Sequence, residues 1–219
     1  MNKNIQVAID SPAAAGAGTQ AKLIAKHYNL FYLDTGKIYR FIGNLKIKHS
    51  KKFNYSLVKK KIKDLNIKKL QNKKLLSNKV ATEASIIAKD KIIRKIVYSF
   101  QIKCANHPPK NFNGSILDGR DITSVIMKKA MFKFFITAST KIRVLRRFKE
   151  LKSLNKNISY AEVLKSIKIR DKSDYNRKIS PLKRTKDSIL INTSNLTKRA
   201  CFLKIKKIMD NKLNLNGNL

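Results

Sequence analysis

The sequence predicts an α/β fold with three layers, α/β/α, around a parallel five-stranded sheet. Short apolar segments alternate with longer amphipathic ones along the chain, as strands alternate with helical crossovers in parallel sheets. A loop of small residues follows the first apolar segment, and polar clusters follow two others, which is where open parallel sheets bind ligands. With 219 residues, 42% of them hydrophobic, the chain can bury one core with insertions.

The first part of the chain alternates strand and helix. The apolar run 5–10 is the first predicted strand, and 18–28 is a helix because its apolar residues recur on repeating faces. Residues 29–33 form the second strand and end at 34–36, an Asp-Thr-Gly capping signal. A helix follows, running through Ile42.

The rest of the chain continues the alternation after an insertion. Lysine-rich residues 46–80 are predicted to form an inserted helical and β-hairpin segment, and the apolar periodicity of 82–105 predicts one long helix. The remaining predicted strands are 115–117, 131–137 and 187–192. The remaining predicted helices are 139–154, 159–170 with a capping box from Ser159 to Glu162, and 196–210 before a frayed tail.

Residues 11–19 have the frame of a phosphate-binding loop between a strand and a helix. Gly16 matches the second Gly of the pattern G-x-x-x-x-G-K-[ST], Ser11 and Ala17 replace its first Gly and its Lys, and Gly18 and Thr19 follow. Small residues let backbone N–H groups approach a polyphosphate, the helix N-terminus attracts it, and the Thr19 hydroxyl can ligate Mg²⁺. The loop therefore predicts nucleotide binding without the usual cation. The alternative is a helix start rich in Ala and Gly that binds nothing.

Polar residues also follow the second and third predicted strands. Thr35 and Arg40 bring a hydroxyl, a helix N-terminus and a guanidinium to one spot, which suits a second anion. The alternative is an ordinary capped helix with a surface arginine. The run 118–121, Asp-Gly-Arg-Asp, offers a carboxylate for a Mg²⁺-bound water and an arginine for a phosphate, or else a tight turn with a salt bridge.

Arg170, Asp174 and Arg177 are spaced at i, i+4 and i+7, so that they share one helix face. Two guanidiniums held by a central carboxylate can clamp a phosphoryl group in transfer. The alternative is a surface ion pair.

The chain is strongly basic, with 50 Lys and Arg against 13 Asp and Glu and a formal net charge of +37. Such a charge can indicate nucleic-acid binding. The lysines are spread along the whole chain, however, and the densest runs, 59–63 and 68–74, alternate with Ile and Leu as on an amphipathic surface. We therefore expect no specific nucleic-acid partner, only weak nonspecific binding at low salt.

Other features of the sequence bear on the cellular compartment and on metal binding. No apolar run approaches the roughly 20 residues of a membrane span, and the N-terminus lacks the apolar region of a signal peptide. Cys104 and Cys201 are isolated, which fits a reducing, cytoplasmic setting. The three histidines are scattered, so that no metal cluster is expected.

Six segments carry a resemblance over about residues 5–210: VAIDSPAAAGAGT (7–19), LDTGKIYR (33–40), EASIIA (83–88), LDGRDI (117–122), FFITAST with IRVLRR (134–147), and RDKSDYNRKISPL (170–182). In order and spacing they resemble the bacterial cytidylate (CMP/dCMP) kinases, nucleoside monophosphate kinases of the P-loop class. The resemblance implies transfer of the ATP γ-phosphoryl group to CMP or dCMP with Mg²⁺. We expect these small-molecule partners, no membrane, and a monomer.

The resemblance also implies domains and roles. The P-loop core would comprise 1–34, 106–150 and 178–219, the NMP-binding insertion with its long helix 35–105, and the lid 151–177. The implied ATP-binding residues are Ser11, Pro12, Ala13, Ala14, Ala15, Gly16, Ala17, Gly18 and Thr19, the last also a Mg²⁺ ligand. The implied CMP-binding residues are Thr35, Tyr39, Arg40, Ser85, Arg120 and Asp121. The implied catalytic residues are Arg146, Arg147, Arg170, Arg177 and Asp174.

Three positions depart from the family pattern. Ala17 replaces the loop Lys, Ser11 replaces the first Gly, and Gln101-Ile102 stands where the family has Gln-Arg, which puts one monophosphate contact in doubt. Three hypotheses follow: an active cytidylate kinase, a pseudoenzyme that binds nucleotide as a regulatory module, or a basic nucleic-acid binder on the same fold.

Overall fold

The computed structural model describes residues 4–154 and 157–215 and contains a five-stranded parallel sheet in the order β2-β3-β1-β4-β5. The strands are β1 (Ile5–Asp10), β2 (Phe31–Asp34), β3 (Gly114–Gly119), β4 (Phe132–Thr137) and β5 (Ile189–Asn192). The α-helices are α1 (Ala17–Tyr28), α2 (Thr35–Lys48), α3 (Tyr55–Lys63), α4 (Asn78–Ile87), α5 (Lys91–Asn106), α6 (Thr140–Leu154), α7 (Tyr160–Asn176) and α8 (Lys198–Leu215). The predicted α/β class and parallel sheet are confirmed.

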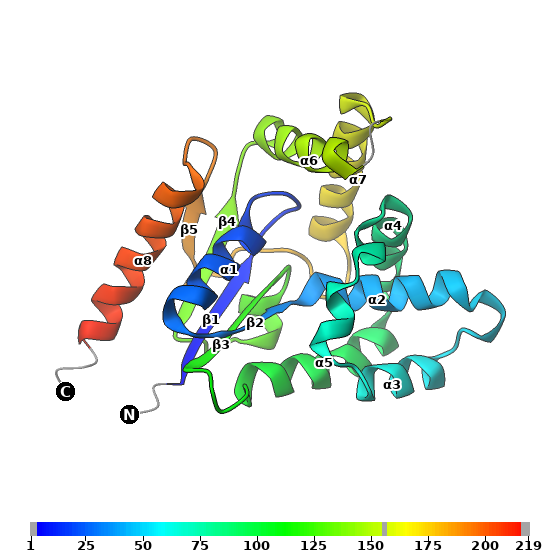
Figure 1. Cartoon of the computed structure of the whole chain (residues 1–219), viewed down its shortest axis with the longest axis horizontal. Helices are drawn as coiled ribbons and strands as arrows, with labels where there is room; N and C mark the ends of the chain where they lie inside the picture. Colours follow the sequence, from blue (N-terminus) through cyan, green and yellow to red (C-terminus); the bar gives the residue numbers. More distant parts are fainter. Residues whose placement is uncertain (1–3, 155–156, 216–219) are drawn as a thin grey trace.

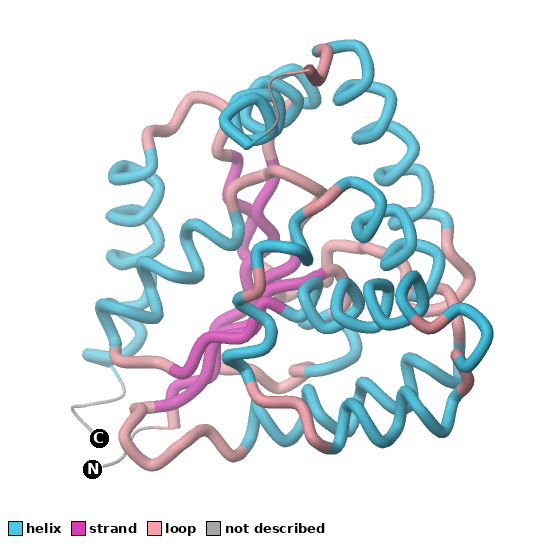
Figure 2. The backbone as a smooth tube through the Cα atoms, turned by 45° about the vertical axis from the view of Figure 1, so that its right-hand side comes forward, coloured by secondary structure: helices cyan, strands magenta, loops and turns pink. Residues whose placement is uncertain are grey.

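Helices cover both faces of the sheet, which Figure 2 shows as a narrow band between them. Side chains alternate along β1, so that Val7 and Ile9 pack with α1 and α8 on one face while Ala8 joins the core of α2 and α5 on the other. Helices α6 and α7 pack together through a separate small cluster that includes Val144 and Val163, and they lie above the upper end of β4 (Figure 1).

The carboxyl ends of three adjacent strands meet at one edge of the sheet. Strand β3 lies between β2 and β1, with Asp118 in register with Asp34 on one side and Ile9 on the other. Residues 11–16, the start of α2, and residues 118–121 are therefore neighbours. The predicted convergence of three polar clusters at this edge is confirmed, and it positions the site described below.

The predicted β-hairpin within 46–80 is wrong, because the described residues there form no strand. Helix α3 is flanked by the 3-10 segments η1 (Ser50–Lys52), η2 (Ile67–Gln71) and η3 (Lys73–Leu76). Side-chain oxygens of Asn54, Asn66 and Asn72 accept hydrogen bonds from backbone N–H groups at the starts of α3, η2 and η3. These N-caps favour short helical turns over strand pairing.

The single long helix predicted for 82–105 is also wrong. The chain breaks into α4 and α5 around Asp90, whose carboxylate accepts hydrogen bonds from the N–H groups of Ile92 and Ile93. An aspartate inside an apolar periodic run can thus start a new helix by capping it. In α5, Arg94 pairs with Asp121 at the carboxyl edge of the sheet.

The later helices follow the prediction more closely. The capping box between Ser159 and Glu162 is present at the start of α7. That helix continues past residue 170 to Asn176, with Arg177 as its C-terminal cap. The predicted frayed tail falls partly on α8, which extends to Leu215, and partly on 216–219, which lie outside the described residues.

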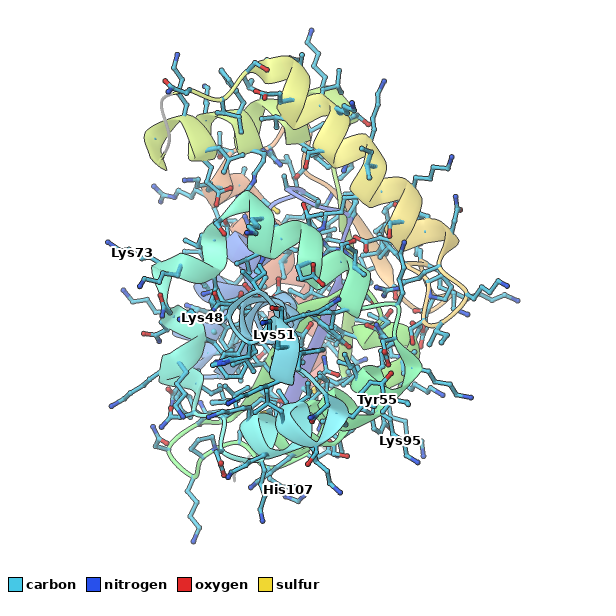
Figure 3. All side chains as sticks on the ribbon, turned by 90° about the vertical axis from the view of Figure 1, so that its right-hand side faces the viewer. Lys48, Lys51, Tyr55, Lys73, Lys95 and His107 are labelled. Atoms are coloured by element: carbon cyan, nitrogen blue, oxygen red, sulfur yellow. The ribbon has the colours of Figure 1, made fainter. Side chains whose placement is uncertain are left out.

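Lysines are spread over the surface. Figure 3 shows Lys73 and Lys95 extending away from the ribbon, and both are exposed. Within the described ranges, no helix is both long enough and apolar enough to cross a bilayer.

Candidate active site

The loop between β1 and α1 presents a row of backbone N–H groups. Ala14 (φ 60°) and Gly16 (φ 94°) adopt left-handed conformations, which turn successive N–H groups to one side. In the part of the chain that the structure describes, the N–H groups of Ala13, Ala14, Gly16 and residues 17–19 have no hydrogen-bond acceptor. This concave row of donors at a helix N-terminus is suited to a polyphosphate.

Two arginines of α6 hold the carbonyl side of this loop. Arg143 Nη1 donates to Ala13 O at 3.2 Å, and Arg146 Nη1 donates to Ala15 O at 3.3 Å. The sequence predicts Arg146 as a site residue but gives no role to Arg143. The predicted Arg147 pairs with Glu150 at 2.8 Å, and its charge contributes to lowering the pKa of Arg40 and of Arg170.

The residues predicted to act from 170–177 converge around one buried carboxylate. Asp174 Oδ2 lies 2.8 Å from Arg120 Nε and 3.7 Å from Arg170 Nε. Asp174 Oδ1 lies 3.8 Å from Arg177 Nη1. Burial alone would raise the pKa of Asp174, but the charges of Arg120 and Arg170 outweigh it and hold the pKa below its ordinary value.

A second carboxylate, Asp121, extends this cluster toward α5. It pairs with Arg94 Nη2 and lies 3.9 Å from Arg177 Nη2. The Arg94 guanidinium also lies 5.6 Å from the centre of the Tyr39 ring, which places Tyr39 beside the same charges. Four guanidiniums, those of residues 94, 120, 170 and 177, therefore share two carboxylates.

The arginine cluster has donors that the described protein atoms leave unused. Arg170 Nε and Arg177 Nη2 are both buried and have no hydrogen-bond acceptor among the described residues. Burial, together with the nearby Arg120 charge, lowers the pKa of Arg170 to about 9. Burial also lowers the pKa of Arg177, with help from Arg94. A buried N–H group without an acceptor is costly, so an anion that accepts hydrogen bonds from Arg170 Nε and Arg177 Nη2 would remove this cost.

The remaining predicted monophosphate residues lie around the start of α2. Thr35 Oγ1 donates to Asp118 O at 2.8 Å, which fixes the helix start against β3. Arg40 Nη1 donates to Leu75 O at 2.8 Å, so that η3 holds this guanidinium. Ser85 lies on α4, which packs on α2 so closely that a Cβ on Gly43 would be 3.1 Å from Ala84 N. Thr35 and Arg40 thus lie on α2, and Ser85 lies on the adjacent α4.

Two aspartates, Asp10 and Asp118, organise the edge through hydrogen bonds. Asp10 accepts hydrogen bonds from the N–H groups of Ile122 and Thr123 and from the Thr123 hydroxyl, which fixes the π-helical turn η4 (Ile122–Ile126) directly after the Asp-Gly-Arg-Asp run. Asp118 accepts from the Tyr32 hydroxyl at 3.0 Å, and its Oδ2 lies 3.5 Å from where a Cβ on Gly18 would stand. The carboxylate of Asp118 is therefore beside the first turn of α1.

The oxygen groups at this turn fit Mg²⁺. Thr19 is exposed and its hydroxyl has no partner among the described residues, and the Asp118 carboxylate lies beside the adjacent Gly18. A hydroxyl together with a carboxylate that binds through water is a donor set typical of Mg²⁺ at nucleotide sites. The structure thus offers ligands of the right chemistry at the position where the sequence predicted them.

Asp118 should make stability fall as pH rises. Burial, together with the Asp34 charge, raises the pKa of Asp118 from its ordinary value of 3.8 to about 8. Between these values the folded chain keeps a proton that the unfolded chain releases, so the free energy of unfolding decreases with increasing pH. We expect Asp118→Asn, which stays neutral, to flatten this part of the profile in urea titrations from pH 5 to 8. Parallel profiles for the two proteins would contradict the assignment.

Sequence reasoning missed Arg94. It lies on the buried face of α5 with Val97 and Gln101, at i+3 and i+7. An arginine on an otherwise apolar helical face is a signal that could have identified it. Ile102 and the exposed Lys103 stand at or next to the position where the family has an arginine, and it is Arg94 that brings a guanidinium from α5 to Asp121.

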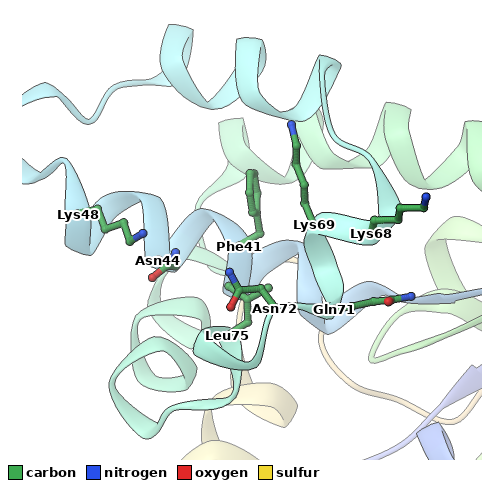
Figure 4. A pocket seen from close by; sticks show the side chains of 8 residues that line it. All are labelled: Phe41, Asn44, Lys48, Lys68, Lys69, Gln71, Asn72 and Leu75. Carbon is green, nitrogen blue, oxygen red and sulfur yellow. The ribbon is translucent and has the colours of Figure 1, made fainter.

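A separate pocket lies on the outer side of α2. It has a volume of about 590 Å³ and lies between α2 and the segments η2 and η3 (Figure 4). Its lining residues are Phe41, Asn44, Lys48, Lys68, Lys69, Gln71, Asn72 and Leu75. None of the predicted site residues lines it, and the chemistry of phosphate recognition is concentrated at the carboxyl edge instead.

Comparisons with known proteins identify the family. A family model described as cytidylate kinase matches residues 7–211. A cytidylate kinase of Clostridium botulinum is 39% identical over 205 residues, covering 89% of this chain and 92% of the relative. A cytidylate kinase of Mesorhizobium japonicum is 36% identical over 208 residues, covering 94% of each chain. The solved structure of an uncharacterized protein from Eubacterium ventriosum, 16% identical, covers 94% of this chain and 98% of that one with a TM-score of 0.56, which shows a shared fold alone. The chain therefore belongs to the cytidylate kinase family and is a nucleoside monophosphate kinase.

Proposed function

We propose that the protein transfers the γ-phosphoryl group of ATP to CMP or dCMP, giving ADP and CDP or dCDP, with Mg²⁺. The observation that supports this most strongly is the pair of buried N–H groups on Arg170 and Arg177 that have no acceptor among the described residues. Both arginines surround Asp174, which pairs with Arg120 directly after β3, at the edge of the sheet where the loop also lies. A phosphoryl group passing between two anionic nucleotides needs positive charge around it, and catalysis in this class consists mostly of positioning and charge neutralisation.

The loop and the first turn of α1 would bind ATP. The N–H groups of residues 13–19 would donate to its phosphates. Thr19, with Asp118 acting through water, would hold Mg²⁺, which supplies neutralising charge on the phosphate oxygens.

The opposite side of the site would bind the monophosphate. Thr35, Tyr39, Arg40, Ser85, Arg120 and Asp121 would hold CMP or dCMP, and Arg94 would join them through Asp121. Two of these guanidiniums are held by hydrogen bonds: Arg40 donates to Leu75 O, and Arg120 donates to the Asp174 carboxylate. Fixed donors reduce the conformational entropy lost on binding.

In the transfer step, an oxygen of the CMP phosphate would attack the γ-phosphorus of ATP. The bond from that phosphorus to the β,γ-bridging oxygen would break, and its electron pair would leave with ADP. Arg146, Arg147, Arg170 and Arg177 would neutralise the charge on the transferring group, and Asp174 would orient Arg170 and Arg177. Each preorganised donor of this kind contributes about 10²–10³ in rate.

Ala17 is the observation that favours a second candidate. Without the loop Lys, the protein could be a nucleotide-binding module without turnover. Against this stands the arginine cluster, because a chain with no phosphoryl group to neutralise has no physical reason to bury four guanidiniums around two carboxylates. We therefore propose an active enzyme.

A nucleic-acid role is less supported. An affinity for nucleic acid that does not fall steeply as salt rises to 200 mM would exclude an electrostatic binder.

The decisive test is ADP formation from ATP and Mg²⁺, with and without CMP or dCMP. We expect CMP-dependent turnover by the natural sequence. Nucleotide binding without any CMP-dependent ADP above background would instead support the module. The same assay on Ala17→Lys measures how much rate the missing ammonium would add.

The division into core, insertion and lid at the sequence-predicted boundaries stays a proposal, as do a monomeric state and a cytoplasmic location. The free thiols of Cys104 and Cys201 accord with a reducing compartment.

A further inference from the structure

The loop has an alanine where its cation is expected, and three side chains near it carry positive charge. Lys22 is exposed on α1, and its charge lowers the pKa of Asp118. Arg143 and Arg146 reach the loop from α6. Which of them can act on a bound polyphosphate depends on the donors that remain unused.

Arg143 has no unused donor. Its Nε donates to Ala138 O, Nη1 to Ala13 O and Asp171 Oδ1, and Nη2 to Thr140 Oγ1 and Asp171 Oδ2. All five N–H groups of the guanidinium are thus engaged. The bidentate pair with Asp171 also neutralises its charge. Arg143 therefore ties the loop to α7 and is not available to a ligand.

Arg146 differs from Arg143 in having unused N–H donors and in having no carboxylate partner among the described residues. It makes three hydrogen bonds, from Nη1 to Ala15 O and Thr193 Oγ1 and from Nη2 to Thr193 O. Its Nε–H and one Nη2–H are left without an acceptor among the described residues. It also forms no ion pair with a carboxylate of the described chain, unlike Arg143 and Arg147. Its Nη1 lies 3.6 Å from where a Cβ on Gly16 would stand, directly beside residue 17.

Thr193 fixes Arg146 at this place. It follows β5, is 3% exposed, and its N–H donates to Thr137 O at 2.8 Å at the end of β4. Its hydroxyl accepts from Arg146 Nη1 at 2.8 Å and donates to Ala15 O at 2.9 Å. One buried hydroxyl thus connects the sheet, the loop and the guanidinium.

We infer that Arg146, held by Thr193, supplies the cation that the loop lacks at Ala17, and that Thr193 is a positioning residue for ATP. This inference rests on the proposed function for the identity of the nucleotide. It predicts that a lysine at position 17 improves ATP binding mainly when the Thr193 hydroxyl no longer holds the Arg146 guanidinium.

The experiment is a cycle of variants at 17 and 193. Thr193→Val removes the hydroxyl at nearly constant volume, and Thr193→Ser retains it. Each is made with Ala17 and with Ala17→Lys. The readouts are the Kd of a non-hydrolysable ATP analogue with Mg²⁺ by calorimetry, the CMP-dependent kcat, and the thermal unfolding midpoint.

We expect Thr193→Val to weaken analogue binding about tenfold, the effect of losing one hydrogen bond to a charged group, and Thr193→Ser to stay within threefold of the natural protein. Ala17→Lys should restore most of the affinity for the analogue that is lost in Thr193→Val, and the gain in affinity there should exceed its gain in the natural background.

The inference is overturned if Thr193→Val binds the analogue as the natural protein does, or if Ala17→Lys improves binding by the same factor in both backgrounds. If Thr193→Val fails to fold, the test is made in the natural background. A tenfold or larger gain in affinity for the analogue from Ala17→Lys there overturns the inference. If the affinities follow the expected pattern but no variant phosphorylates CMP, the proposed acceptor is wrong and the role of Arg146 stands.

Discussion

Replacing Arg177 by methionine should lower kcat/KM for CMP by about 10²–10³, the typical effect of removing one preorganised donor from a phosphoryl-transfer site. The Arg177 side chain is 5% exposed, lies between Asp121 and Asp174, and has a buried Nη2 without an acceptor among the described residues. Methionine has a similar length and no charge, so the packing changes less than the electrostatics. Steady-state rates with varied CMP at saturating ATP measure the effect.

The matched control for this variant is Lys178→Met. Lys178 is the next residue, is exposed, and has no ion pair among the described residues, so its replacement should change kcat/KM less than twofold. Both variants should be compared at equal folded fraction. If Arg177→Met keeps more than a third of the natural kcat/KM, the guanidinium is not part of the transfer site.

Replacing Asp174 by alanine should destabilise the fold by about 3–5 kcal/mol, as expected when one member of a buried ionic group is removed. Three guanidiniums, those of residues 120, 170 and 177, would lose a shared carboxylate. Urea unfolding at pH 7 measures the loss. Because the folded-state pKa of Asp174 lies below the ordinary 3.8, its stabilising contribution is present above that value and is lost as pH falls through the lower pKa.

Glu150→Ala provides the contrast for Asp174→Ala. Glu150 is 51% exposed and pairs with Arg147 at i,i+3 spacing. Exposed pairs of this kind contribute about 0.5 kcal/mol or less, so this variant should unfold almost as the natural protein does. A loss of under 1 kcal/mol in Asp174→Ala would show that the arginine cluster does not depend on its central carboxylate.

The parts of the site that the sequence predicts are those set by local pattern and by strand ends. Residues 11–19 and 118–121 directly follow apolar strands, so their convergence follows from parallel pairing alone. The spacing of Arg170 and Asp174 predicts a shared helical face, and the structure brings both to Arg120.

The missed features depend on contacts between distant segments or on capping. Asp90 looks like part of a periodic helix, and only its capping bonds reveal a break. Arg143 and Thr193 meet the loop from 130 and 178 positions away, a pairing that no local pattern encodes. Lysines 68 and 69 lie together between Ile67 and Leu70, a pattern too short to define the element, and the capping bonds of the asparagines stabilise the helical turns.

The bond from Arg40 to Leu75 O has a consequence for how the insertion can vary. Its acceptor is a main-chain carbonyl, which every amino acid possesses. The exposed lysines of η3, Lys73 and Lys74, can therefore be exchanged over evolutionary time without loss of this contact, provided that the backbone keeps its path. A deletion or insertion of a single residue between α3 and α4 would move the carbonyl instead. The exposed positions of this stretch are thus expected to vary in composition while its length is held constant.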